Sequence, residues 1–145
     1  VVTRAFNHAG PGRGEMYAES SFAKKIVEVE LSRAKVVEHG NLESVRNYTD
    51  VRDIVRAYRL AIDLPVGIYN ICSDQNITMQ ELMDMLIKNS TAKIKTGVNS
   101  ALYRPADFSF KQPSCEKFKQ LTGWKPTIPL ETTMKDLLNY WRERL

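Results

Sequence analysis

Three arginines far apart in the sequence have the chemistry to hold a phosphorylated ligand. Arg13 lies in a glycine-rich turn, Arg46 follows downstream, and Arg104 opens the segment Arg104-Pro-Ala-Asp107. A guanidinium group can bind phosphate oxygens through two parallel hydrogen bonds, and glycine lets the backbone approach an anion closely. The pattern therefore predicts a site for clustered phosphate charge.

The turn that carries Arg13 also contains Asn7 and His8, at the end of a predicted strand where α/β proteins bind ligands. The Asn7 amide can donate to a phosphate or sugar oxygen, but Asn also suits a turn with positive φ. His8 is either a ligand contact or a structural residue with a local hydrogen bond. Arg13 lies between two glycines, so we expect its side chain to reach an anion unobstructed. The turn is not a Walker loop, because Gly-Lys-Ser/Thr is absent.

Arg46 and Arg104 each have a second interpretation. We expect Arg46 at a strand edge, where it contacts either a ligand or one of two nearby carboxylates, Asp50 and Asp53. Arg104 precedes a proline, which favours extended backbone, and Asp107 follows closely. An arginine for phosphate and a carboxylate for ribose hydroxyls would clamp a nucleotide, whereas the alternative is a local ion pair.

Catalytic and metal-binding patterns are missing from this sequence. None of its tyrosines is followed four residues later by lysine, the spacing at which a phenol and an ammonium cooperate in proton transfer. No G-x-G-x-x-G motif follows a strand. Cys72 and Cys115 have neither zinc-ligand nor disulfide spacing, so we expect buried thiols and no metal site.

The 145 residues are enough for one domain with a hydrophobic core, and the net charge of +4 is mild. The basic residues are scattered among acidic ones, so we expect no nucleic-acid partner. No apolar run approaches the roughly 20 residues of a membrane helix, and no leader pattern is present, so we expect a cytoplasmic protein without a membrane partner. The sequence begins at Val1 inside an expected strand, and we expect it to be part of a longer polypeptide.

Expected strands alternate with expected helices, which is typical of an α/β protein. The strands are expected at 1–6, 35–38, 67–73 and 92–98. The helices are expected to begin near Ser20, after Asp50, after Thr78, after Ser114 and after Pro129. Asp50 and Ser114 are predicted caps, Thr78 and Glu81 form a capping box, and Gly123 ends the fourth helix. The charged residues expected to face solvent on the first two helices are Lys24, Lys25, Glu28, Glu30, Arg52, Arg56 and Arg59.

Six motifs, taken in order, resemble one enzyme family. They are Thr3-Arg-Ala-Phe-Asn-His-Ala-Gly-Pro-Gly-Arg13, Gly40-Asn-Leu-Glu-Ser-Val-Arg46, Thr49-Asp-Val-Arg-Asp-Ile-Val-Arg-Ala-Tyr58, Tyr69-Asn-Ile-Cys-Ser73, Arg104-Pro-Ala-Asp107 and Gly123-Trp-Lys-Pro126. Together they resemble the C-terminal half of the extended short-chain dehydrogenases/reductases. Within that superfamily they are most similar to the GDP-mannose branch, with GDP-mannose 4,6-dehydratase and GDP-4-keto-6-deoxymannose reductase. The motif at 49–58 favours the reductase.

The resemblance implies a fold and a function. The fold would be the C-terminal part of an NAD(P)-binding Rossmann-like α/β enzyme, with the last sheet strands and a small substrate-binding domain in a single unit, residues 1–145. The complete enzyme would use NADP, act on a GDP-sugar and form a homo-oligomer. We expect reduction of GDP-4-keto-6-deoxymannose to GDP-rhamnose. The alternatives are a GDP-mannose 4,6-dehydratase, another NAD-dependent nucleotide-sugar epimerase or dehydratase, a non-catalytic nucleotide-sugar-binding module, and a structural domain whose arginines are solvated.

The resemblance also implies roles for single residues. Asn7 would contact the sugar-phosphate region, His8 and Arg13 would line NADP, Arg46 and Arg104 would grip the GDP pyrophosphate, and Asp107 would face the guanosine ribose. The family often has a second arginine where this chain has Gly12. The family's glycine-rich cofactor loop and Tyr-x-x-x-Lys pair lie outside the matching region, so we expect substrate recognition without catalysis from these residues alone. Without the remaining sheet we expect self-association, a rearranged edge or marginal stability.

Overall fold

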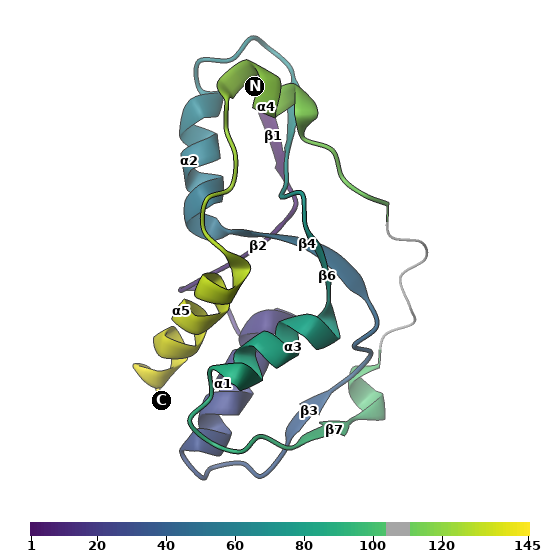
Figure 1. Cartoon of the computed structure of the whole chain (residues 1–145), viewed down its shortest axis with the longest axis vertical. Helices are drawn as coiled ribbons and strands as arrows, with labels where there is room; N and C mark the ends of the chain where they lie inside the picture. Colours follow the sequence, from purple (N-terminus) through teal and green to yellow (C-terminus); the bar gives the residue numbers. More distant parts are fainter. Residues whose placement is uncertain (104–110) are drawn as a thin grey trace.

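The chain folds into an α/β structure in which helices and strands alternate (Figure 1). A computed structural model describes residues 1–103 and 111–145. The strands are β1 Val2–Ala5, β2 Asn7–Ala9, β3 Val37–His39, β4 Val45–Asp50, β5 Ile68–Ile71, β6 Asn76–Thr78 and β7 Thr96–Val98. The helices are α1 Ala18–Glu30, α2 Val51–Ala61, α3 Met79–Lys88, the 3₁₀ helix η1 Ser100–Leu102, α4 Glu116–Thr122 and α5 Leu130–Arg142. The expected α/β class is confirmed.

The strands form three small sheets. β1 pairs with β5 in parallel, β2 and β6 flank β4, and β3 pairs with β7 in parallel. β2 runs parallel to β4, whereas β6 runs antiparallel to it. The strand expected at 1–6 is confirmed as β1, which ends at Ala5; the following strand β2, in another sheet, was not predicted. Within the described residues β1 pairs with β5 alone, and Val2 and Ile68 are exposed; self-association stays a prediction.

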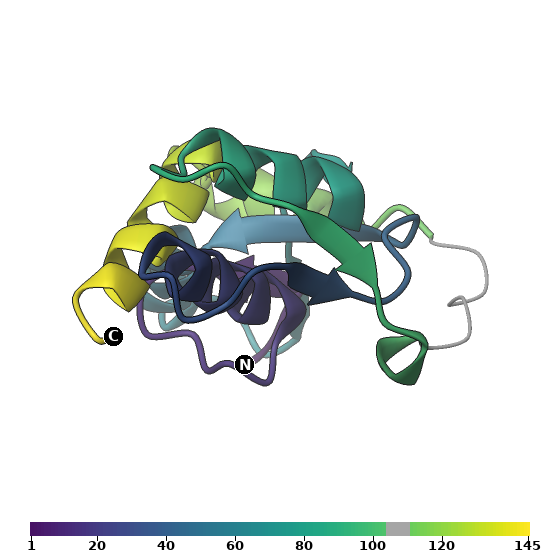
Figure 2. The ribbon, with the colours of Figure 1, turned by 90° about the horizontal axis from the view of Figure 1, so that it is seen from below.

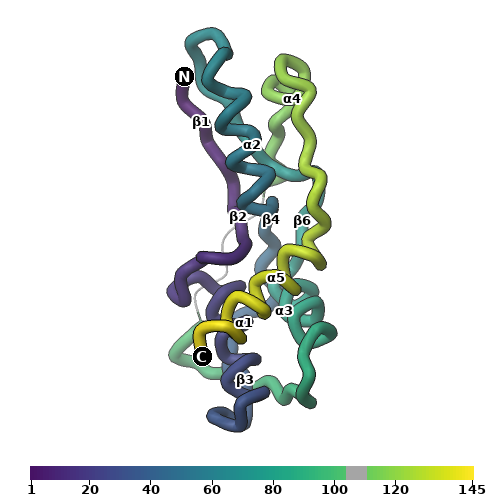
Figure 3. Tube along the Cα trace, turned by 90° about the vertical axis from the view of Figure 1, so that its left-hand side faces the viewer, coloured from purple at the N-terminus to yellow at the C-terminus, as the bar shows by residue number. Residues whose placement is uncertain are grey.

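The structure has two hydrophobic cores. Figure 3 shows the helices of the first core, α1, α3 and α5, in the lower half of the molecule and those of the second, α2 and α4, in the upper half. The first core lies where α1, α3 and α5 pack against one another and against β2 and β4. The second core lies between α2, α4 and the β1–β5 pair, and its aromatic residues Tyr69, Phe118 and Trp124 meet edge to face. Cys72 and Cys115 are buried in this second core as free thiols, as expected, and Cys115 Sγ donates to the Cys72 carbonyl oxygen at 3.1 Å.

Local cap signals predict three of the helix boundaries. The Asp50 side chain accepts a hydrogen bond from the Arg52 amide at the start of α2, and the capping box of Thr78 and Glu81 opens α3. Gly123 ends α4 in the left-handed conformation, with φ of 67°. Ser114 as the cap of α4 is wrong, because Cys115 occupies that position without a side-chain hydrogen bond.

Glu30 fastens the ends of three helices together, so its expected solvent-facing position is wrong. Its side chain is 8% exposed and forms an ion pair with Arg142 of α5 at 2.7 Å. It also accepts hydrogen bonds from Ser90 and Thr91, directly after α3. Hydrogen bonds from Arg142, Thr91 and Ser90 outweigh burial and lower the pKa of Glu30 to about 2.

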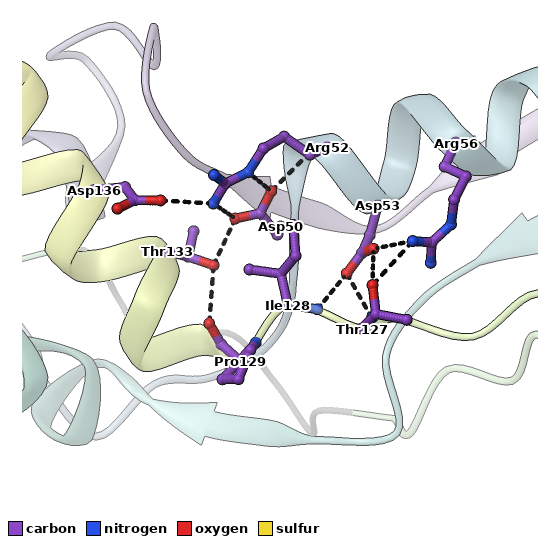
Figure 4. Close-up of polar contacts among 9 residues, drawn as sticks. All are labelled: Asp50, Arg52, Asp53, Arg56, Thr127, Ile128, Pro129, Thr133 and Asp136. Carbon is purple, nitrogen blue, oxygen red and sulfur yellow. Dashed lines mark hydrogen bonds and ion pairs between the residues drawn. The ribbon is translucent and has the colours of Figure 1, made fainter.

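The start of α2 carries two buried carboxylates that bind the segment before and within α5 (Figure 4). Asp50 accepts hydrogen bonds from Arg52 and from the Thr133 hydroxyl, at 2.8 and 2.7 Å. Asp53 accepts from the backbone amides of Thr127 and Ile128, at 2.8 and 3.0 Å. These bonds fix α5 against the end of β4.

Two arginines of α2 complete these contacts. Arg52 bridges Asp50 and Asp136, each at 2.8 Å, and Arg56 pairs with Asp53 at 2.9 Å. Arg52 and Arg56 are exposed, as expected, but each also forms ion pairs that were not predicted. Burial alone would raise the pKa of Asp50, but the hydrogen bonds from Arg52 and Thr133 outweigh it and hold that pKa below its usual value.

Asp53→Ala should destabilise the protein by about 3 kcal/mol, because it leaves two backbone amides without their acceptor. Urea unfolding followed by circular dichroism measures the difference. Asp63→Ala, at an exposed position just after α2, is the matched control and should change stability by less than about 0.5 kcal/mol. Equal stability of the two variants would contradict the assigned role of Asp53.

Glu30→Gln should lower the free energy of unfolding by about 2 kcal/mol at pH 7. The folded-state pKa of Glu30 lies below its unfolded value, so the carboxylate stabilises the protein above pH 4.5 and loses this effect as the pH falls towards 2. The difference in the free energy of unfolding between wild type and variant, measured by urea unfolding at each pH, should therefore become smaller between pH 5 and pH 2.5. Glu28→Gln, which removes a half-exposed charge from the same helix, should show a small gap that changes little with pH.

Candidate functional site

A cavity of about 660 Å³ lies between the start of α1, the end of β3, the first half of β4, and η1. Figure 2 shows β3 and β7 side by side, with η1 directly after β7. The cavity has a size ordinary for a small-molecule site, and charged side chains from separate segments line it.

The cavity brings together three of the six predicted site residues. Asn7, Arg13 and Arg46 all line it, although they belong to β2, the glycine-rich turn and β4. His8 is not among the lining residues, and its Nδ1 lies 3.0 Å from the Phe6 carbonyl oxygen. In this structure His8 is therefore a residue with a local hydrogen bond, which is the second of the two alternatives given for it above. The two remaining predicted residues, Arg104 and Asp107, lie outside the described residues.

Arg13 is held firmly, so the expected unobstructed side chain is wrong. Its Nε donates to Glu19 Oε1 at 3.0 Å, and its guanidinium carbon lies 3.3 Å from the centre of the Tyr17 ring. The second oxygen of Glu19 accepts from the Tyr48 hydroxyl at 2.9 Å. Burial, together with the negative charge of Glu19, strongly raises the pKa of Tyr48, so this phenol stays protonated and is unsuited to proton transfer.

The local sequence explains this position of Arg13. Gly12 adopts φ of 91°, which allows the turn to reverse before α1. α1 begins at Ala18, so Glu19 lies in its first turn, where the helix dipole favours a carboxylate. The next residue, Ser20, donates its hydroxyl to the Arg13 carbonyl oxygen at 2.6 Å. Both the backbone and the side chain of Arg13 are thereby fixed to the start of α1.

Arg46 lies on β4, the central strand of its sheet, and not at a strand edge as expected. Its Nη1 donates to the Val45 carbonyl oxygen at 2.8 Å. The expected alternative, an ion pair with Asp50 or Asp53, is not what the structure shows, since Arg52 and Arg56 occupy those carboxylates.

The sequence analysis missed most of the lining, and Lys25 and His39 are two of the polar residues that it missed. Lys25, expected to face solvent, lines the cavity and donates to the Glu38 carbonyl oxygen at 3.0 Å. Lys25 lies four residues after Ser21, which also lines the cavity, so both share one face of α1, but no signal in the sequence marked that face. His39 also lines the cavity, with Nδ1 2.8 Å from the Gly40 carbonyl oxygen. Because a carbonyl only accepts, this nitrogen carries the proton.

The cavity is balanced in charge but has its carboxylates engaged. Glu15 pairs with Lys24, Glu19 binds Arg13, and Glu38 accepts from Asn99 at 3.0 Å. The cationic side chains of the lining are Lys25, Arg13 and Arg46, and Arg13 is the one that pairs with Glu19. The arrangement therefore suits an anion that several separate cations can share.

A second hollow, of about 470 Å³, lies beside α3 and the start of α5. Its lining includes Glu81, Asp84, Glu131 and a single cation, Lys88. Phosphate charge would be repelled there, so the larger cavity is the candidate anion site. Among the residues that the structure describes, no cluster of three metal-ligating side chains occurs, and no helix has the length and apolar content to cross a membrane.

Comparison with known proteins identifies relatives of the whole chain. The family model described as GDP-mannose 4,6 dehydratase matches residues 1–137. A GDP-6-deoxy-D-mannose reductase from Pseudomonas aeruginosa is 30% identical over 148 residues, which cover 100% of this chain and 49% of that protein. A human GDP-mannose 4,6 dehydratase is 23% identical over 155 residues, covering 92% of this chain and 41% of that protein.

A solved structure shares the fold. The structure of RMD from Pseudomonas aeruginosa complexed with NADPH superposes with a TM-score of 0.91 at 27% identity, over 99% of this chain and 48% of that one. The chain thus spans about half the length of the relatives it matches. Because the superposition includes both hydrophobic cores, the arrangement of sheets and helices described above is that of the corresponding half of its relatives.

Gly40→Ala should displace η1 and reshape the cavity. A methyl group at Gly40 would collide with the backbone carbonyl of Leu102, which cannot move like a flexible side chain. We expect a loss of about 1–3 kcal/mol in the free energy of unfolding. Gly14→Ala is the matched control, because a methyl group there meets no atom within 4 Å and should be nearly neutral. Equal melting temperatures for the two variants would argue against this packing.

Proposed function

Because this chain belongs to the GDP-mannose 4,6-dehydratase family, we propose that it forms the GDP-sugar-binding part of an NADP-dependent enzyme. The reaction we propose is reduction of GDP-4-keto-6-deoxymannose to GDP-rhamnose. The higher identity to the bacterial reductase than to the human dehydratase supports this choice. The name of that reductase, which specifies a GDP-linked deoxymannose, supports the sugar and the base.

The observation that carries the proposal is the convergence of Arg13, Arg46 and Asn7 in one cavity. In the proposed complex Arg46 and Lys25 bind the pyrophosphate oxygens. Arg13, which shares their cavity, binds the same phosphate group, in place of the cofactor contact expected from the resemblance. The Asn7 amide donates to the sugar-phosphate oxygens. Arg104 on pyrophosphate and Asp107 on the ribose stay predictions.

NADP is the cofactor we propose for the complete enzyme, where it supplies the hydride for the C4 keto group. Parallel β1 and β5 end at the same edge, where an α/β sheet meets its ligands, and His8 lies in β2, the strand that comes after β1. His8 is therefore retained as the candidate contact to NADP. The RMD structure with NADPH supports the choice of cofactor.

The residues of this chain bind and orient the sugar nucleotide in the proposed reaction. The 145-residue sequence has no Tyr-x-x-x-Lys pair, and we assign it no catalytic residue. We treat residues 1–145 as one substrate-binding unit. The proposal includes a cytoplasmic location and homo-oligomers of the complete enzyme.

A GDP-mannose 4,6-dehydratase is the second candidate. The description of the matching family model and the similarity to the human dehydratase favour it. Both candidates need the same GDP pocket, so the cavity described above serves either one. They differ in the sugar nucleotide consumed, which turnover assays of the complete enzyme distinguish.

The test of the proposed function is calorimetric titration of the 145-residue protein with GDP. The wild type should bind, and Arg46→Ala should weaken binding by about 1.5–3 kcal/mol, or roughly 10- to 100-fold, through loss of a charged hydrogen bond to phosphate. Arg33→Ala removes an exposed arginine beyond the end of α1 and should leave the affinity unchanged.

Two outcomes would contradict the proposal. One is the absence of GDP binding by the wild type, and the other is equal affinity of the Arg46 and Arg33 variants. UDP at the same concentration should compete weakly, because the proposal assigns the site to guanosine nucleotides.

A further inference from the structure

We propose that Glu19 is a positioning residue, which holds the guanidinium of Arg13 in the orientation that receives a phosphate group. The inference rests on the proposed function, because it assumes that the cavity binds a phosphorylated ligand. The proposal explains why the cavity contains the buried carboxylate of Glu19, whose negative charge would not by itself help to bind an anion.

A carboxylate beside an anion site is unfavourable unless it serves another group. Glu19 is 2% exposed, and a buried carboxylate needs strong partners to remain charged. Both of its oxygens have one, since Oε1 accepts from Arg13 at 3.0 Å and Oε2 accepts from Tyr48 at 2.9 Å. Tyr48 fixes the carboxylate, and the carboxylate in turn fixes Arg13.

The hydrogen bond to Glu19 uses the Nε atom of Arg13 and does not involve its two Nη atoms. Glu19 bonds to Nε, whereas the end of the fork that binds phosphate bidentately is formed by the two Nη atoms. Tyr17 packs against the flat face of the group at 3.3 Å. With one edge and one face occupied, Arg13 retains little rotational freedom.

This arrangement reduces the entropic cost of binding. An unrestrained arginine would lose its rotamer freedom when it bound a phosphate, whereas Arg13 has already lost it in the free protein. The same negative charge also repels the ligand. Positioning and repulsion therefore predict opposite effects when the charge of Glu19 is removed.

Glu19→Gln separates the two roles by the sign of its effect on GDP affinity. If Glu19 positions Arg13, the substitution should weaken binding roughly 3- to 10-fold. If Glu19 is only a nearby negative charge, binding should become tighter, and that result would overturn the proposal. Glu28→Gln, on the same helix but outside the lining of the cavity, is the control and should leave the affinity unchanged.

A double-mutant cycle tests whether Glu19 acts through Arg13. In an Arg13→Lys background, which removes Nε and the planar fork, Glu19→Gln should cause no further loss of affinity. An equal loss in both backgrounds would overturn the proposal. Glu19→Asp keeps the charge but withdraws it from Nε by one methylene, and it should also weaken binding. Tyr48→Phe should lower the melting temperature with a smaller effect on affinity, since the bond between Glu19 and Arg13 remains.

The ligand-free protein gives an independent readout. The Nε–H signal of Arg13 in a ¹H–¹⁵N spectrum, identified by its loss in Arg13→Lys, should be sharp and slow to exchange with water. In Glu19→Gln it should broaden or exchange rapidly, and an unchanged signal would overturn the proposal. If the wild type fails to bind GDP, the proposed function fails, while this spectrum still decides whether Glu19 orients Arg13.

Discussion

The structure depends on two buried carboxylates at the start of α2. Asp50 ends β4 and caps the helix, and Asp53 lies one turn further on. They bind Thr133 of α5 and the amides of Thr127 and Ile128 in the segment that links α4 to α5. A buried carboxylate without hydrogen-bond donors costs folding free energy, so these bonds favour one position of the C-terminal segment over all others. β4, whose side chains form one wall of the cavity, is thereby held between α2 and α5.

The cavity depends on a second set of bonds at the start of α1. Glu19 connects Arg13 of the glycine-rich turn to Tyr48 of β4, so the turn and the strand are joined through one carboxylate. The first turn of a helix suits that carboxylate, because the helix dipole stabilises negative charge there. The candidate site thus has a fixed cation in place of a freely rotating arginine, and the same bond gives the buried carboxylate of Glu19 a charged partner.

The sequence predicted helix caps well, because a cap depends on residues close together in the chain. The caps at Asp50, Thr78 and Gly123 depend on neighbouring residues alone, and all three are confirmed. The contacts missed at Arg52 and Glu30 involve partners distant in sequence, Asp136 and Arg142, because α5 packs against α1 and its Asp136 reaches the start of α2. The cap expected at Ser114 failed although it is a local signal. The approach of Arg13 and Arg46 was predicted from their chemistry and the family resemblance. Lys25 was missed because helical periodicity does not reveal which polar face borders a cavity.

The order in which the chain visits its two cores has a topological consequence. β1 belongs to the second core, β2 to β4 to the first, α2 and β5 to the second again, α3 to the first, α4 to the second and α5 to the first. No single cut of the backbone can divide these cores into two continuous pieces. A protease that nicks one connecting loop would therefore leave two fragments that remain interlaced, and neither core is an autonomous module that recombination could transplant by itself.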